Sequence, residues 1–157
     1  MTGDERELAI ALFNETWALL DNPERTPEAD DRMIHAAHAS RFHWDNVGTD
    51  ENRAIGEWQV SCVNAVLGRP EPALFHARRA LEYARRPGVP VWVSASAEEG
   101  FARARLAAGD AEGAWLARDR ALGLLEDVDD PQALAVVAAD IASLPLDEKV
   151  RRPVVPA

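Results

Sequence analysis

Three polar side chains in the segment ADDRMIHAAHASRFHWD have the types and spacing that could hold a divalent metal. If this segment is helical, successive residues rotate by about 100°, which places Asp31, His35 and His38 on one narrow face. Imidazole nitrogens and carboxylate oxygens are ligands that zinc accepts in tetrahedral geometry. The chain has no HExxH motif, and His76, with Glu57 or Glu71, completes a site only if the fold brings it near. We favour the simpler interpretation, in which these histidines form hydrogen bonds across a helix interface or are half-exposed.

Nucleophilic and phosphate chemistry have weaker support. Cys62 lies in the middle of a predicted helix with Trp58 and Val66 one turn to either side, a setting typical of a small buried thiol. The sequence contains no glycine-rich phosphate loop, nucleophile elbow or dinucleotide fingerprint. We therefore expect no cofactor and favour a non-catalytic protein.

Composition points to one soluble globular domain. The chain has 157 residues, of which 47% are hydrophobic and 28% are charged, close to the averages for such proteins. A single cysteine excludes a disulfide scaffold, and no apolar run approaches the roughly 18 residues of a membrane span. We expect a cytoplasmic location. Sixteen arginines against one lysine, together with 29 alanines, are typical of a GC-rich bacterial genome.

The charge is negative overall and unevenly distributed. The formal net charge of −10 disfavours nucleic acid and anionic membranes as partners, because binding to phosphate needs clustered cations. By segment the formal charge is −8 over residues 1–68, +2 over 69–120 and −4 over 121–157. This asymmetry is compatible with head-to-tail self-association, and also with an ordinary solvated surface.

Helical periodicity dominates the chain, and helix-breaking residues divide it into about seven segments. Short turns between predicted helices make neighbours antiparallel. After Pro145, the remainder is a short, charged and proline-bearing C-terminal tail, residues 146–157. The predicted helices cover about 4–20, 27–44, 49–68, 70–86, 90–109, 110–127 and 131–144.

An internal repeat links the central segments. LGRPEPALFHARRAL (67–81) aligns with AGDAEGAWLARDRAL (108–122) at an offset of 41 residues. In both copies a glycine, Gly68 or Gly109, ends one helix, where a left-handed residue is tolerated. The alanines that follow are spaced four and three apart and form a narrow face that lets two helices approach closely; they are Ala73, Ala77 and Ala80.

This pattern resembles the tetratricopeptide repeat family, over residues 50–127. The matching positions are Ser61, Gly68, Ala73, Ala80 and Leu81, then Ala102, Gly109, Ala114, Ala121 and Leu122. The 41-residue offset is longer than the family's unit of about 34 residues. The resemblance implies an all-α fold of antiparallel hairpins stacked as an α-α superhelix, in a single domain over 1–145. That domain would comprise a degenerate first hairpin (4–44), repeats at about 50–86 and 90–127, and a capping helix (131–144).

In such proteins the first helix of each pair lines a concave surface. The resemblance therefore implies a partner-binding groove, whose lining would include Ile55, Trp58, Cys62 and Val66 from one unit and Ser96, Glu99, Arg103 and Ala107 from the next. The family's lysine and asparagine clamp for peptide C-termini is not recognisable, since Trp58 and Cys62 occupy two of its places. Trp44 and Trp92 lie near predicted helix ends, where we expect partly exposed aromatics that can anchor a partner.

The sequence thus favours a non-catalytic protein–protein interaction module that binds a protein or peptide partner, or a second copy of itself. Two alternatives stay open. One is a metal-binding helical protein or metal-dependent hydrolase that uses Asp31, His35 and His38. The other is a sensor domain with a small ligand between its helices.

Overall fold

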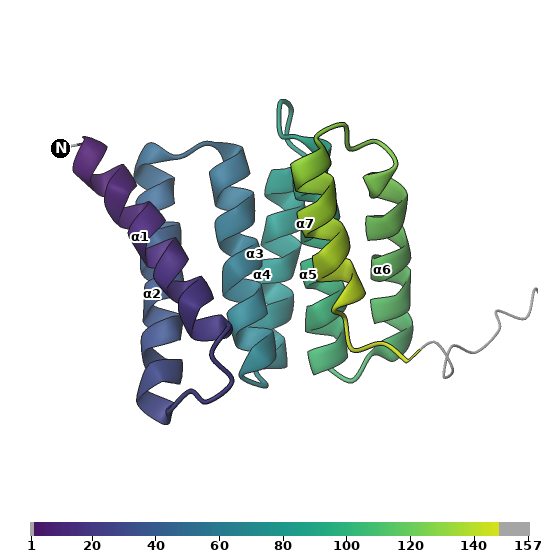
Figure 1. Cartoon of the computed structure of the whole chain (residues 1–157), viewed down its shortest axis with the longest axis horizontal. Coiled ribbons are helices and arrows are strands. Elements are labelled where there is room, and N and C mark those ends of the chain that lie inside the picture. Colours follow the sequence, from purple (N-terminus) through teal and green to yellow (C-terminus); the bar gives the residue numbers. More distant parts are fainter. Residues whose placement is uncertain (1, 148–157) are drawn as a thin grey trace, which may run out of the picture.

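The computed structural model describes residues 2–147, with the side chains of residues 4–147, and over that range the fold is all-α (Figure 1). The predicted fold class and the seven predicted helices are confirmed in this part of the chain. Of the predicted tail, only Leu146 and Asp147 fall within the described residues. The helices are α1 (Thr2–Leu20), α2 (Pro27–Val47), α3 (Asp50–Val66), α4 (Pro70–Ala84), α5 (Val91–Ala107), α6 (Ala111–Leu125) and α7 (Pro131–Ala142).

Side-chain caps define where four of these helices begin. The first turn of a helix has backbone N–H groups without partners inside the helix, and a capping oxygen accepts from one of them. Thr26 accepts from the backbone N–H of Ala29 at 3.2 Å, and Thr49 forms a reciprocal capping box with Asn52. Asp110 and Asp130 cap α6 and α7 in the same way.

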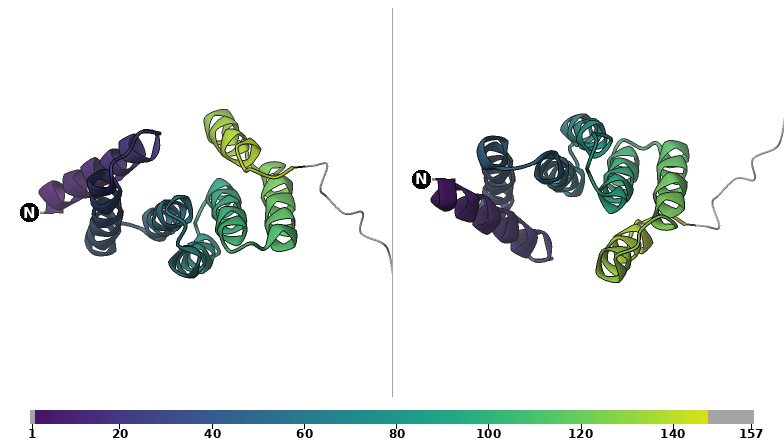
Figure 2. Two further views of the ribbon diagram at one scale, coloured as in Figure 1. Left: turned by 90° about the horizontal axis from the view of Figure 1, so that it is seen from below. Right: turned by 90° about the horizontal axis from the view of Figure 1, so that it is seen from above.

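The helices pair in chain order. The most closely packed pairs are α1 with α2, α3 with α4, and α5 with α6. Each hairpin also contacts the next, because α5 packs against both α3 and α4, and α7 packs against both α5 and α6. In the end-on views of Figure 2, α1 and α7 lie on the same side of this row of helices.

Small side chains bring the two helices of a hairpin together. The predicted alanine face of α4 is buried, with Ala73, Ala77 and Ala80 at most 1% exposed. Because no long side chain intervenes, the hydroxyl of Ser61 on α3 donates a hydrogen bond to the Ala73 carbonyl at 2.8 Å. In α6 the corresponding face consists of Ala114, Ala117 and Ala121, all fully buried.

The 41-residue offset relates equivalent contacts in space. In the α3–α4 hairpin, Arg79 Nε donates to Glu57 Oε1 at 3.0 Å. In the α5–α6 hairpin, Arg120 Nε donates to Glu98 Oε2, also at 3.0 Å. Both acidic residues are buried. The two central hairpins therefore share one internal cross-link in addition to their alanine faces.

The first hairpin is attached by different contacts. Gln59 of α3 donates to the Phe13 carbonyl of α1 at 3.0 Å, and Met33 and Ala37 of α2 pack with two valines of α3, Val60 and Val63. The prediction that Trp44 is partly exposed is wrong, because α2 continues to Val47 and leaves the indole 6% exposed.

Over residues 2–147, no helix is long and apolar enough to cross a membrane.

Candidate functional site

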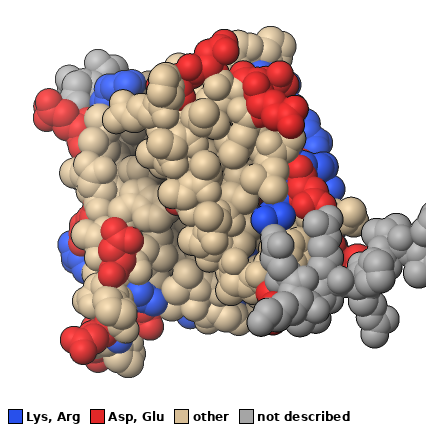
Figure 3. Space-filling model, turned by 45° about the vertical axis from the view of Figure 1, so that its right-hand side comes forward, with Lys and Arg blue, Asp and Glu red and all other residues tan. Residues whose placement is uncertain are grey.

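A groove of about 780 Å³ lies between α1 and α7, over α3 and α5. Its volume is within the range of about 300–1,000 Å³ that is typical of ligand-binding clefts. On the face shown in Figure 3, uncharged residues surround a hollowed centre and charged residues gather toward the edges. The groove is lined by Phe13, Trp17, Asp21, Glu51, Ile55, Trp58, Trp92, Ser96, Asp130, Gln132, Ala133, Val136, Val137 and Asp140.

The lining comes from the first helix of each hairpin and from α7. In a row of antiparallel hairpins the first helices all lie on one side, so side chains from α1, α3 and α5 face the same space. The starting turns of α3 and α5 contribute Glu51 and Trp92, and α7 contributes a face from Gln132 to Asp140. The groove is therefore assembled from four helices that are far apart in the sequence.

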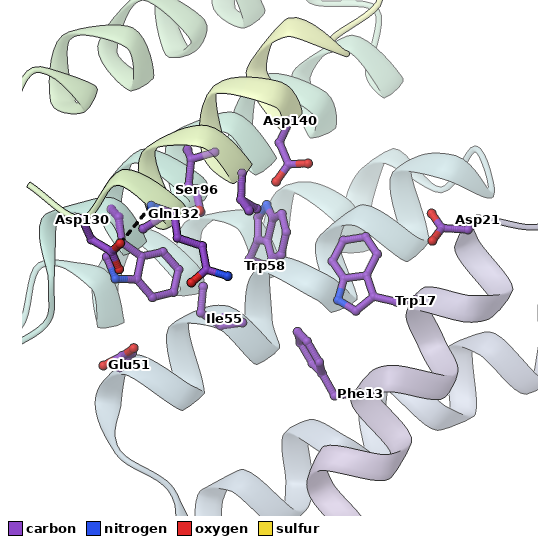
Figure 4. Close-up of a pocket in the computed structure, with 14 residues that line it drawn as sticks. Phe13, Trp17, Asp21, Glu51, Ile55, Trp58, Ser96, Asp130, Gln132 and Asp140 are labelled. Atoms are coloured by element: carbon purple, nitrogen blue, oxygen red, sulfur yellow. Dashed lines mark hydrogen bonds between the residues drawn. The ribbon is translucent and has the colours of Figure 1, made fainter. Parts of the chain in front are cut away.

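Aromatic rings dominate this surface. The rings of Trp17 and Trp58 have centroids 5.2 Å apart, and Phe13 meets Trp17 edge-on with centroids 6.1 Å apart. Figure 4 shows these three side chains directed into the groove. Trp58 lies directly against Gly100 of α5, where an added Cβ would be 2.4 Å from its ring carbon Cδ1. The absence of a side chain at Gly100 thus makes room for the indole.

A buried polar network on the side of Trp58 away from the groove fixes the orientation of its indole. Its Nε1 donates to Glu99 Oε2 at 2.9 Å, and Arg103 Nε donates to Glu99 Oε1 at 2.9 Å. Arg103 also donates to Ser143 Oγ, just beyond α7, at 3.1 Å. Burial raises the pKa of Glu99, against the opposing effects of Arg103 and the Trp58 N–H. The network ties α3, α5 and the end of α7 together beneath the groove.

The structure separates the residues predicted to line the partner-binding surface. Ile55, Trp58 and Ser96 line the groove, and Ala107 does not. Cys62 and Glu99 are buried beneath it, Arg103 is half-buried in the network, and Val66 is exposed at the end of α3. Arg103 is held in the network by hydrogen bonds to the Asp140 carbonyl and to Ser143 Oγ at the end of α7. Burial and the nearby Glu99 carboxylate hold the pKa of the Cys62 thiol well above its ordinary value, which disfavours a nucleophilic thiolate.

The predicted metal ligands do not converge. Asp31 Oδ2 and His35 Nε2 lie 3.7 Å apart, and the two side chains are 75% and 78% exposed. His38 instead turns toward α4, where its ring centroid is 5.3 Å from that of His76. Burial and the neighbouring His76 lower the pKa of His38. Among residues 2–147, no group of three or more His, Cys, Asp and Glu side chains is placed to hold a metal ion.

The fold does bring His76 and Glu57 near His38, but as a junction of three helices. His76 Nδ1 lies 2.6 Å from Glu57 Oε2, while Glu57 Oε1 accepts from Arg41 of α2 at 2.9 Å and from Arg79 of α4. Burial acts to raise the pKa of Glu57, but the hydrogen bonds from His76 and Arg79 and the charge of Arg41 outweigh it and lower the pKa. Two guanidinium groups on this carboxylate also disfavour the approach of a dication.

Sequence reasoning missed the groove residues of α1 and α7, including Phe13, Trp17 and Asp140, because the repeat was aligned only over the central hairpins. The signal that could have located two of them is the same spacing. Equivalent positions at steps of 41 residues are occupied by Trp17, Trp58, Glu99 and Asp140, on α1, α3, α5 and α7. The first two residues are in ring contact, and the second donates its N–H to the third.

Comparison with protein-family models, with curated proteins and with solved structures gives no significant match to this chain.

Proposed function

We propose that this chain is a tetratricopeptide-repeat-like, non-catalytic interaction module that binds a segment of a partner protein in the groove between α1 and α7. Support for the repeat interpretation comes from the paired helices, the alanine faces and the equivalent Glu57–Arg79 and Glu98–Arg120 contacts. Support for binding comes from the position of the groove on the side that carries the first helix of every hairpin.

The observation that carries the proposal is the set of tryptophans at the groove surface. Trp17 and Trp92 are only half-buried and, together with Trp58, they line one continuous cleft. Partly exposed tryptophans lose apolar contact with water when a partner covers them, and such residues supply much of the binding energy at protein interfaces. The ionisable pair nearest the floor, Glu99 and Arg103, is engaged in positioning Trp58, which supports a structural role for it.

Differential capture from the source cells tests this proposal. The full chain would be immobilised as wild type, as Trp92→Ala and as Phe75→Ala, the last being a control on α4 that removes an exposed aromatic outside the groove. We expect one or more defined partners to be retained by wild type and Phe75→Ala. Loss of an anchoring tryptophan should weaken that binding by about 2 kcal/mol, or roughly 30-fold.

Mass spectrometry of the captured material then separates the outcomes. A partner that Trp92→Ala retains as well as wild type does would contradict binding in the groove. Capture of the chain itself, with dimers seen by light scattering of the purified protein, would identify the partner as a second copy. Circular dichroism of each variant checks that the helices are intact.

A further inference from the structure

The charged groups of the groove all have the same sign. Four carboxylates line it, whereas none of its lining residues is arginine or lysine. Figure 4 shows Asp130 and Glu51 near one end of the groove and Asp21 near the opposite end, while Asp140 lies beside Trp58, at the other end of α7 from Asp130. An apolar cleft with acidic groups at both ends attracts a cationic ligand and repels an anionic one.

Asp140 is one of the four groove carboxylates, and it is half-buried. Neither of its carboxylate oxygens has a hydrogen-bond or ion-pair partner among residues 2–147. Arg103 lies near it but donates to the Asp140 backbone carbonyl, and its own ion pair is with Glu99. Burial raises the pKa of Asp140 against the opposing charge of Arg103, and a cation arriving in the groove would further stabilise the ionised carboxylate.

The length of α7 sets the distance between the two acidic ends. Asp130 and Asp140 are ten residues apart on this helix, which corresponds to about 15 Å at a rise of about 1.5 Å per residue. An extended chain covers the same distance in four to five residues, at about 3.3 Å each. A helical ligand is about 10 Å across with its side chains, so an extended segment, which is narrower, can enter the groove more deeply. The dimensions therefore favour an extended ligand.

We propose that the groove selects an extended segment of a partner protein that carries two cationic side chains four to five residues apart, with apolar residues between them. This inference rests on the proposed interaction function and specifies the chemistry of the partner. One cation binds near Asp140 and the other near Asp130, while the residues between contact the indoles of Trp17, Trp58 and Trp92. Tryptophan faces also attract the cationic heads directly.

The chain's own C-terminal segment has a different spacing. Its cations, Lys149, Arg151 and Arg152, fall within four consecutive positions, too close together to reach both acidic ends of the groove in extended form. A foreign segment with wider spacing should therefore bind more tightly than a peptide of residues 148–157. This difference makes that peptide a useful competitor of similar composition.

Calorimetric titration of the full chain with defined peptides tests the proposal. The probe is acetyl-Gly-Arg-Val-Pro-Leu-Arg-Gly-amide, whose arginines are four residues apart and whose proline favours extended backbone. Replacing both arginines by glutamine should weaken binding about tenfold or more, since two charge-assisted contacts are lost. Placing the arginines side by side should also weaken it, as should substituting the peptide of residues 148–157. Equal affinity for the glutamine peptide, or no binding of the arginine probe, would overturn the proposal.

Matched variants locate the effect in the groove. Asp130→Asn/Asp140→Asn removes two negative charges from α7, and asparagine at 130 can still cap the helix. Glu71→Gln/Glu82→Gln removes two exposed charges from α4 and serves as the control. We expect only the first variant to lose about tenfold in affinity for the arginine probe. Equal losses in both variants would attribute the preference to overall charge and overturn a site in the groove.

The failure of this inference differs from the failure of the proposed function. If Trp92→Ala abolishes partner capture while the peptides show no preference for charge, the result supports the interaction groove and refutes the cationic partner. If capture does not depend on Trp92, the proposed function itself is wrong, whatever the peptides do.

Discussion

The two central hairpins share one cross-link but embed it in different surroundings. In the α3–α4 hairpin, Glu57 pairs with Arg79, Arg41 and His76, and the Arg41 side chain is only 7% exposed. In the α5–α6 hairpin, Glu98 pairs with Arg120 and, at 4.0 Å, with Arg85. Those two arginine side chains are 49% and 70% exposed. Both carboxylates are buried, and the equivalent arginines Arg79 and Arg120 are both exposed in part, but only Glu57 also has a buried arginine partner, Arg41.

This difference shows that two repeats can share the same contact while that contact contributes differently to stability. At the first junction Arg41 reaches in from α2 and also forms an ion pair with Asp45, with Nη1 and Oδ1 2.6 Å apart. At the second, a cavity of about 370 Å³ remains, lined in part by Arg85, Glu98 and Arg120. A buried carboxylate paired with a buried cation, as Glu57 is with Arg41, holds its helices in register, while one paired only with solvated cations contributes much less.

The largest predicted effect is therefore at Glu57. Glu57→Gln leaves Arg41 buried without its buried counter-charge, and the exposed Asp45 is then its remaining acidic partner. Removing one partner of a buried ion pair typically costs about 3–5 kcal/mol, and we expect the lower end of that range. Urea denaturation followed by far-ultraviolet circular dichroism measures the loss.

The matched control is Glu98→Gln at the equivalent position. Its arginines return to water when the carboxylate is removed, so we expect a loss of about 1 kcal/mol or less. Comparable losses for the two variants would contradict the contrast between the junctions, because they would show that burial of the carboxylate alone decides its contribution.

Acid should affect the first junction through the same carboxylate. The pKa of Glu57 is lowered in the folded protein, so the unfolded chain takes up this proton first as the pH falls. The stability that Glu57 contributes is fully present above its ordinary pKa of 4.5 and is lost as the pH falls through the lower folded value. We expect the urea midpoints of wild type and Glu57→Gln to converge between about pH 6 and pH 3. Parallel curves over that range would contradict this linkage.

Much of the frame could be predicted from local signals. Thr26, Thr49, Asp110 and Asp130 combine capping side chains with adjacent helix-forming segments, and all four prove to be helix caps. The alanine spacing from Ala73 to Ala80 likewise predicted the buried face of α4. These features depend on contacts within a few residues or on helical periodicity, which a single sequence records directly.

The groove was harder to predict because depth and long-range contacts decide its lining. Glu99 and Trp58 occupy equivalent helix positions and are both buried, yet Trp58 lines the groove whereas Glu99 lies beneath it and accepts its N–H. Periodicity places both on the same face and cannot tell which of them reaches the surface. Trp92 was expected to be partly exposed and lines the groove, whereas Trp44 is covered because α2 runs longer than expected.

The smallest difference that we predict between the two hairpins is at their turns, which should respond alike to substitution. Gly68 and Gly109 have φ angles of +69° and +78°, and a Cβ added at either position would meet no atom within 4 Å. Gly→Ala at these sites should therefore cost only the backbone penalty of the left-handed region, about 1–2 kcal/mol, and the same amount at both. Gly→Asn should cost less, because asparagine tolerates this region better. Thermal denaturation of the four variants measures these differences. Unequal alanine penalties would mean that the two turns, unlike the two cross-links, are constrained by different neighbours, and that the repeat does not extend to the backbone.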